Sequence, residues 1–237
     1  MKPHLAVVAA AAAITSGVAF NGAQAAKLQS RPHIPATTCT AGTWTQMPGD
    51  VTPTMMNGSL AAVTIVSSTD AWAVGHYSLS NNSIGSLWEN WTGGAGWHVV
   101  TNGGANLELQ AITNFGAGNV WAVGGIRKGL KSTATISRWN GTTVVRSTIS
   151  KKPNSDLFGI SGTSESDIWA MGSYESAGKQ HILLYHYNGT KWSLAATPTG
   201  VLFPDGILAL SPTNVYMLVL IESTFKTDLY HFNGSNW

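Results

Sequence analysis

One pattern recurs four times along the chain at a nearly constant spacing, and it constrains the fold more than any other feature. Each copy places Asp or Asn two residues before an aromatic residue, and three of the four copies then close on Gly. The copies are Asp70-Ala-Trp72-Ala-Val-Gly75, Asn119-Val-Trp121-Ala-Val-Gly124, Asp167-Ile-Trp169-Ala-Met-Gly172 and Asn214-Val-Tyr216-Met-Leu-Val219. The aromatic positions 72, 121, 169 and 216 lie 49, 48 and 47 residues apart. A repeat of this length indicates one supersecondary unit used several times, whose apolar face is buried only by its neighbours.

A second landmark follows each copy and keeps the same period. It is an aromatic residue before a Gly-containing turn, at Trp91, Trp139, Tyr187 and Phe232. In the last three copies the turn is Asn-Gly, which between strand-like runs predicts a type I′ hairpin. The third copy contains four strand-like runs, at 157–161, 168–172, 181–187 and 192–196. Four antiparallel strands in a unit of this length are typical of a blade, so the sequence predicts an all-β fold, a β-propeller of four-stranded antiparallel blades.

The expected propeller domain spans residues 42–237. Its units are placed at about 58–105, 106–155, 156–204 and 205–237. Residues 42–48 resemble a fourth strand and offer a closing strand for the last unit, which would give a four-bladed ring. However, Trp44 and Trp237 would then occupy the same landmark twice. The sequence therefore favours an incomplete array, with the four-bladed ring as the alternative.

The N-terminal residues are expected to direct export and not to fold. Residues 1–25 combine Lys2, an apolar run and a small-x-small site ending at Ala25, which predicts a cleaved signal peptide. Residues 26–41 form a polar, Pro-containing linker, and its Cys39 is the single cysteine, so no internal disulfide is possible. No later run approaches the roughly 18 apolar residues of a membrane span. The protein is therefore expected to be secreted, either extracellular or at the periplasm or cell surface.

Composition and motifs argue against several function classes. Charged residues make up only 10% of the chain and the formal net charge is +2. Since Lys151 and Lys152 form only a pair, which we interpret as a solvated loop, nucleic acid is not an expected partner. The sequence has no zinc spacing, calcium loop or phosphate-binding loop, so neither a metal nor a cofactor is predicted.

The repeated motif residues are predicted to be structural. Trp72, Trp121 and Trp169, with Tyr216 in the last unit, lie inside apolar runs and are expected to pack between blades. The Asp or Asn before each aromatic residue is expected to cap backbone amides at a turn, in preference to binding a metal.

Function is instead expected in the segments that do not repeat. In a propeller, the connections between second and third strands and the connections between blades lie at the same end. These segments differ in every unit, at 76–84, 125–133, 173–180 and 220–227. Variable loops on a rigid scaffold are common binding sites. The predicted ligand-binding residues are exposed polar and aromatic residues of these segments, with Asp205 added from a connection between blades at 203–205: Tyr77, Asn82, Arg127, Lys128, Tyr174, Lys179, Asp205 and Phe225.

At these motifs the chain resembles exported bacterial kelch-like and sialidase-type propeller repeat proteins. The resemblance covers about residues 42–237 but departs from both families, because the kelch Gly-Gly pair matches only at Gly124-Gly125 and no sialidase box is intact. A sialidase implies several Arg from different blades, whereas Arg127, Arg138 and Arg146 lie in one unit. A galactose-oxidase-like copper site implies a Cys within the fold. Neither activity is therefore expected.

The sequence favours an exported, non-enzymatic binding or scaffold module, with a glycan, a peptide or a cell-surface protein as its partner. No catalytic residue is predicted. The alternative is a secreted hydrolase or lyase acting on polysaccharide, with loop carboxylates such as Glu175 and Asp205. A truncated propeller fragment without independent activity is a further alternative.

Overall fold

The structure is a computed structural model that describes residues 57–79, 81, 83–94, 96–149, 151–198, 203–221 and 224–237. All of them lie in the second of two compact units, Thr45–Trp237. The expected signal peptide, linker and closing strand 42–48 lie outside the described residues. Within the described part of the chain, no helix is long and apolar enough to cross a membrane.

The described residues form fifteen strands in four antiparallel sheets, so the predicted all-β, propeller-like fold is confirmed. The first sheet holds β1 (Asn57–Ser67), β2 (Asp70–Ser78), β3 (Ile84–Trp91) and β4 (Trp97–Ala105). The second holds β5 (Leu107–Asn114), β6 (Val120–Lys128), β7 (Lys131–Trp139) and β8 (Val144–Arg146). The third holds β9 (Ser155–Ser164), β10 (Asp167–Ser176), β11 (Lys179–Tyr187) and β12 (Trp192–Leu194). The fourth holds β13 (Phe203–Ser211), β14 (Asn214–Ile221) and β15 (Lys226–Phe232). We call these sheets blades 1 to 4.

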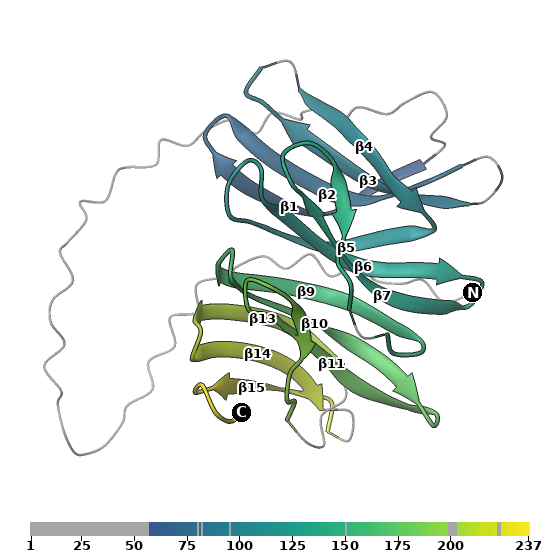
Figure 1. Cartoon of the computed structure of the whole chain (residues 1–237). Coiled ribbons are helices and arrows are strands. Elements are labelled where there is room, and N and C mark those ends of the chain that lie inside the picture. The colour runs from purple at the N-terminus through teal and green to yellow at the C-terminus, as the bar shows by residue number, and fades with distance from the viewer. Residues whose placement is uncertain are drawn as a thin grey trace, which may run out of the picture. The chain divides into compact units, whose positions relative to one another are not determined.

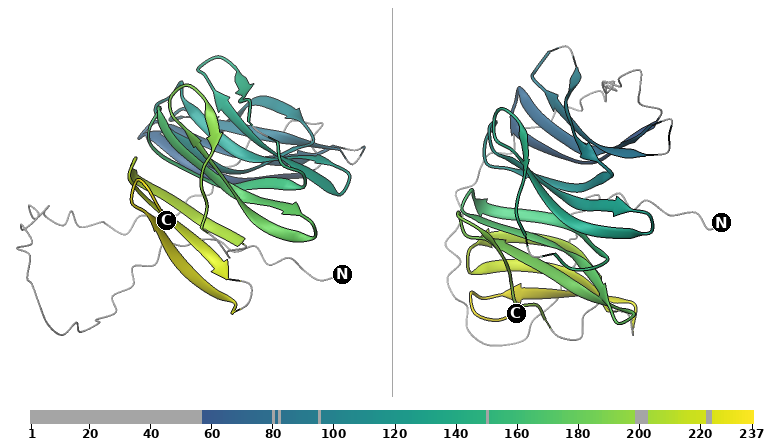
Figure 2. Two further views of the ribbon diagram at one scale, coloured as in Figure 1. Left: turned by 60° about the horizontal axis from the view of Figure 1, so that its bottom comes forward. Right: turned by 45° about the vertical axis from the view of Figure 1, so that its right-hand side comes forward.

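The blades follow one another in chain order, as Figures 1 and 2 show. The first strand of each blade contacts the first strand of the next, from β1 through β5 and β9 to β13. One apolar cluster lies at each of the three junctions. The motif Trp of each blade packs on the second-landmark aromatic residue of the following blade, with ring centroids 5.3 Å apart for Trp72 and Trp139, 5.2 Å for Trp121 and Tyr187, and 5.4 Å for Trp169 and Phe232. All three motif tryptophans are buried, which confirms that they are core residues.

The Gly that closes the motif is required by a close backbone approach. The first strand of each blade bulges at this point, and its register shifts opposite the motif. A Cβ built on Gly75, Gly124 or Gly172 would lie 1.9 Å from a carbonyl oxygen of that strand. Because no carbon can approach an oxygen so closely, only Gly fits at this position in blades 1 to 3. Blade 4 has the equivalent register shift between Pro204 and Gly206 but pairs Val219 there.

The Asn-Gly turns form as predicted, but not as type I′ turns. Gly189 has a φ of 88°, while Asn188 is not among the described non-glycine residues with positive φ. The Asn188 side chain instead accepts hydrogen bonds from the backbone N–H groups of Thr190 and Lys191, both at 3.0 Å. The same arrangement occurs at Asn140 and Asn233. The Asn is therefore selected for its side-chain oxygen, which replaces a backbone acceptor.

The expectation that the motif Asp or Asn caps backbone amides is wrong for the contacts that the structure describes. These residues bond instead to side chains of the third strand: Asn90 donates to Asp70 at 2.7 Å, the His186 ring nitrogen lies 2.7 Å from Asp167, and that of His231 lies 2.8 Å from Asn214. In blade 2, Asn119 accepts a hydrogen bond from the indole N–H of Trp121 at 2.7 Å. In blades 1, 3 and 4 the motif residue therefore links the second strand to the third, whereas Asn119 bonds within β6 and donates to Glu165 of blade 3 at 3.0 Å.

Candidate functional site

The connections between second and third strands are shorter than the sequence predicted. Strand pairing continues beyond the motif Gly, so β6 and β7 are joined by Gly129 and Leu130 alone, and β10 and β11 by Ala177 and Gly178. Gly129, Ala177 and Gly178 have positive φ, which suits such tight turns. We call the end of the blades that carries these turns and the connections between blades the variable-loop end.

The predicted ligand-binding residues lie mostly on strands and not in loops. Arg127 and Lys128 end β6, Tyr174 lies in β10, Lys179 begins β11, and the exposed Asp205 lies in β13. Their place at the variable-loop end is retained because the strands extend toward it. Their role in binding stays a prediction.

Three further placements complete this set. Tyr77 is buried in β2, where its ring lies over Gly85, so its predicted exposure is wrong. Phe225 is largely exposed and lies just before β15. Asn82 falls outside the described residues.

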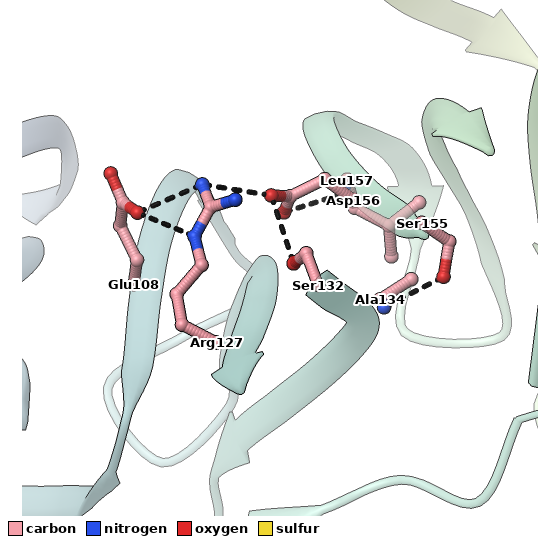
Figure 3. A network of polar contacts seen from close by, with 7 residues as sticks. All are labelled: Glu108, Arg127, Ser132, Ala134, Ser155, Asp156 and Leu157. Carbon is pink, nitrogen blue, oxygen red and sulfur yellow. Dashed lines mark hydrogen bonds and ion pairs between the residues drawn. The ribbon is translucent and has the colours of Figure 1, made fainter. Parts of the chain in front are cut away.

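Arg127 joins two carboxylates from two different blades (Figure 3). Its Nε and one terminal nitrogen both lie 2.9 Å from Glu108 Oε2, on β5 of the same blade. The same terminal nitrogen lies 3.0 Å from Asp156 Oδ2, on β9 of blade 3. Arg127 was predicted as a ligand-binding residue, but its guanidinium is occupied in linking blades 2 and 3.

Asp156 is the most buried of these three charged residues. Its Oδ2 accepts a hydrogen bond from Ser132 at 3.2 Å, and its Oδ1 accepts one from the backbone N–H of Leu157 at 3.1 Å. Burial raises the pKa of Asp156, while the Arg127 charge and the two hydrogen bonds oppose the rise. Arg127 therefore favours the charged form of this carboxylate against the effect of burial.

Ser155, beside Asp156, fixes the connection between blades 2 and 3. Its hydroxyl accepts a hydrogen bond from the backbone N–H of Ala134 at 2.9 Å and donates one to the Lys152 carbonyl at 2.7 Å. The backbone that carries Lys151 and Lys152 is thus anchored to β7. Cationic side chains on an anchored segment are better placed for recognition than those on a free loop.

A basic hollow of about 510 Å³ opens next to this network. It lies along β7 where the short β8 ends, and three of its lining residues are cations: Lys128, Arg146 and Lys151. Four further lining residues carry hydroxyl groups, at Thr133, Thr135, Ser147 and Thr148, and Ile126, Ala134 and Ile149 add apolar surface. No carboxylate lines the hollow among the residues that the structure describes. Cations and hydroxyls without an opposing carboxylate form a surface suited to a polar anion.

A smaller group of polar rings lies nearby in sequence, on the blade 3 side. The Lys152 ammonium lies 5.2 Å from the centre of the Tyr174 ring, and Tyr174 stacks on His181 with centroids 5.0 Å apart. This contact brings Tyr174, a predicted ligand-binding residue, together with Lys152, which the sequence analysis interpreted as part of a solvated loop. It holds a phenol, an imidazole and an ammonium, groups that exchange protons.

Two cations of the basic hollow, Arg146 and Lys151, were not predicted as ligand-binding residues. A signal was present: residues 109–155 contain seven of the thirteen Lys and Arg of the chain and no Asp or Glu. The low net charge of the whole chain conceals this local excess. Among the described residues, no three His, Cys, Asp or Glu side chains gather into a group that would hold a metal ion.

Comparison with known proteins agrees with the fold but does not assign a family. No protein-family model matches the sequence, and no curated protein matches it. The structure is similar to that of a polysaccharide lyase described as a PL25 ulvan lyase, with a TM-score of 0.50 and 14% sequence identity. A second structure of that lyase, bound to -[GlcA(1-4)Rha3S]-, matches with the same values.

The likeness is one of fold. The match covers 73% of this chain and 50% of the lyase chain, so this chain spans about half the length of the solved structure that it resembles. A chain in the crystal structure of a nidogen–laminin complex matches with a TM-score of 0.41 and 9% identity, which is too distant to bear on the fold. The propeller-like arrangement of the blades is thus shared with a carbohydrate-active protein, while kelch or sialidase membership has no sequence match to support it.

Proposed function

We propose that this propeller-like protein binds an acidic polysaccharide at the basic hollow. The observation that carries the proposal is the lining of that hollow by Lys128, Arg146 and Lys151 together with several hydroxyl side chains. Uronate carboxylates and sugar sulfates are anions that ammonium and guanidinium groups bind through charge-assisted hydrogen bonds. Sugar hydroxyls pair with Ser and Thr hydroxyls, so one surface suits both parts of such a chain.

Support of a different kind comes from the similar lyase. One of its structures is bound to -[GlcA(1-4)Rha3S]-, whose two units carry a carboxylate and a sulfate. From this lyase structure we take only the class of ligand, an anionic polysaccharide. It replaces the broader expectation of a glycan, peptide or surface partner.

Cleavage of the bound chain is the second candidate function, and the contact between Lys152, Tyr174 and His181 favours it. Breaking a uronate polymer by elimination requires a base that removes the proton next to the carboxylate and a cation that stabilises the resulting negative charge. As the carbon–carbon double bond forms, the bond to the glycosidic oxygen breaks, and the protonated base returns a proton to that oxygen. A phenol or imidazole beside an ammonium offers both kinds of group. In this reading the basic hollow positions the polymer, and these three residues supply the proton transfer.

The binding proposal is tested by titrating the purified protein with polyglucuronate, and with neutral dextran as the uncharged control. We expect the double variant Lys128→Ala/Lys151→Ala to bind polyglucuronate about tenfold more weakly, because two charge-assisted contacts are lost in a solvent-screened site. Added salt should also lower the affinity of the wild-type protein for polyglucuronate.

The matched control is Lys191→Ala/Lys226→Ala, which removes the same charge from positions that do not line the basic hollow. Its affinity should stay within about twofold of the wild type, since only the long-range field changes. Equal weakening by both double variants would mean that binding follows net charge alone and would refute the site. Ultraviolet absorbance of unsaturated uronate in the same incubations reports whether the bound polymer is also cleaved.

A further inference from the structure

The three blade junctions inside the chain are built from the same pair of positions. One is the residue two places after the motif aromatic, and the other is its partner on the third strand. The pairs are Val74 with Trp88, Val123 with Ile136, and Met171 with Leu184. All six side chains are at most 1% exposed, because the following blade covers them. These positions therefore define the leading face of a blade, the face that packs on the next blade.

Blade 4 leaves the same positions uncovered. Leu218 pairs with Leu229 in the equivalent place, and they are 42% and 61% exposed. Tyr216, at the motif aromatic position, stacks on His231 within its own blade. A hollow of about 380 Å³ lies on this face, lined by Gly206, Ile207, Leu208, Tyr216, Leu218 and Leu229. The leading face of blade 4 is thus an apolar junction surface with no following blade among the described residues.

Blade 1 also exposes apolar residues, on its opposite face. We call this the trailing face, the face that in blades 2 to 4 packs on the preceding blade. Val63 pairs with Ala73, and the equivalent residues of blades 2 to 4 pack into the junction with the preceding blade: Ile112, Ile160 and Ile207. Val63 itself is 62% exposed, and Ile65 on the same side of the strand is 72% exposed. Large exposed apolar patches of this kind mark surfaces that bind another protein.

We propose that a second copy of this chain covers both faces, with the leading face of blade 4 in each copy packed on the trailing face of blade 1 in the other. The three internal junctions show that a leading face and a trailing face of these repeats fit together. A second copy brings one of each, so two identical head-to-tail junctions close the pair without leaving an apolar face open. Two sets of four blades make eight, which lies within the range of four to eight found in propellers.

The arrangement is tested by sedimentation of the purified protein and of two single variants. The wild type should sediment as a dimer. Leu218→Asp and Val63→Asp each place a carboxylate in the proposed junction, and each should raise the dimer dissociation constant about 100-fold, which is typical of losing a central apolar contact. Leu130→Asp alters a fully exposed turn residue away from both faces and should remain a dimer.

Mixing the two junction variants separates a head-to-tail pair from other arrangements. One variant keeps an intact leading face and the other an intact trailing face, so an equimolar mixture should regain dimers that neither forms alone. A monomeric wild type, in which another segment of the same chain covers the faces, would overturn the proposal. So would a Val63→Asp variant that remains fully dimeric, or open-ended oligomers of the wild type. If either variant fails to fold by circular dichroism, Leu208→Asp and Ile65→Asp replace it on the same two faces.

Discussion

Replacement of Gly172 by alanine is expected to lower the free energy of unfolding by about 3 kcal/mol, at the upper end of what overpacking a core costs. The added Cβ would lie 1.9 Å from the carbonyl oxygen of Asp156 and 2.6 Å from the Cα of Leu157. Both atoms belong to backbone, which cannot rotate away as a side chain does. The strands must therefore separate at the bulge, and backbone hydrogen bonds between β9 and β10 are lost.

Thermal or urea unfolding measures this loss, which corresponds to roughly 10 °C in Tm for a domain of this size. Gly94→Ala is the matched control, because a Cβ at Gly94 meets nothing within 4 Å and its φ is not positive. It should change the stability by less than about 0.5 kcal/mol. If Gly172→Ala proved as harmless as Gly94→Ala, the explanation of the motif Gly by a bulged first strand would be wrong.

The substitution Arg127→Met is expected to cost about 2 kcal/mol at pH 7 and clearly less near pH 4. Removing one partner of a buried ion pair leaves the other charge without compensation. The Asp156 side chain is only 10% exposed, so water cannot replace the guanidinium. The expected loss of stability is smaller than for a fully buried ion pair because the Arg127 side chain is 39% exposed.

The pH dependence follows from the raised pKa of Asp156. A carboxyl whose pKa is higher in the folded than in the unfolded protein binds protons more tightly when folded, so its contribution to stability falls as pH rises from its ordinary value of 3.8 through the raised value. Arg127 opposes the effect of burial on this pKa, so the loss of Arg127 should raise the pKa of Asp156 further. At pH values above that pKa, the loss of folding stability should therefore be larger. Below it, Asp156 is neutral and needs no counter-charge.

Urea unfolding at several pH values measures this difference. Lys131→Met removes an exposed cation from the same hairpin and should change stability by less than about 0.5 kcal/mol at every pH. The double variant Arg127→Met/Asp156→Asn removes the buried charge together with its partner and should recover most of the loss. A cost of Arg127→Met that is equal at pH 4 and pH 7 would show that the network contributes packing and not charge compensation.

The fold was predictable because the same sequence pattern occurs in four successive units. Two landmarks in register fixed the blade type, and the burial of Trp72, Trp121 and Trp169 followed from their apolar neighbours. Side-chain contacts between neighbouring strands were harder to predict from the sequence. That Asp167 pairs with His186 depends on strand register, which sequence spacing leaves open.

The candidate site was only partly predictable. The sequence predicted binding at the variable-loop end of the blades, which stays a prediction, and it placed Arg127 and Tyr77 in loops, although both lie in strands. Strand ends are hard to locate where pairing continues through polar residues, because the alternation of apolar and polar side chains stops before the hydrogen bonds do. Arg146 and Lys151 are distant from Lys128 in sequence and line one hollow with it because β7 pairs with β6 and β8 pairs with β7.

A crystal structure of the protein with a uronate oligosaccharide would show whether an anionic sugar chain binds in the basic hollow. We expect a sugar carboxylate within hydrogen-bond distance of at least two of the cations Lys128, Arg146 and Lys151, with Thr or Ser hydroxyls on the sugar oxygens. An oligosaccharide bound instead at the opposite end of the blades, or contacting none of these cations, would contradict this expectation.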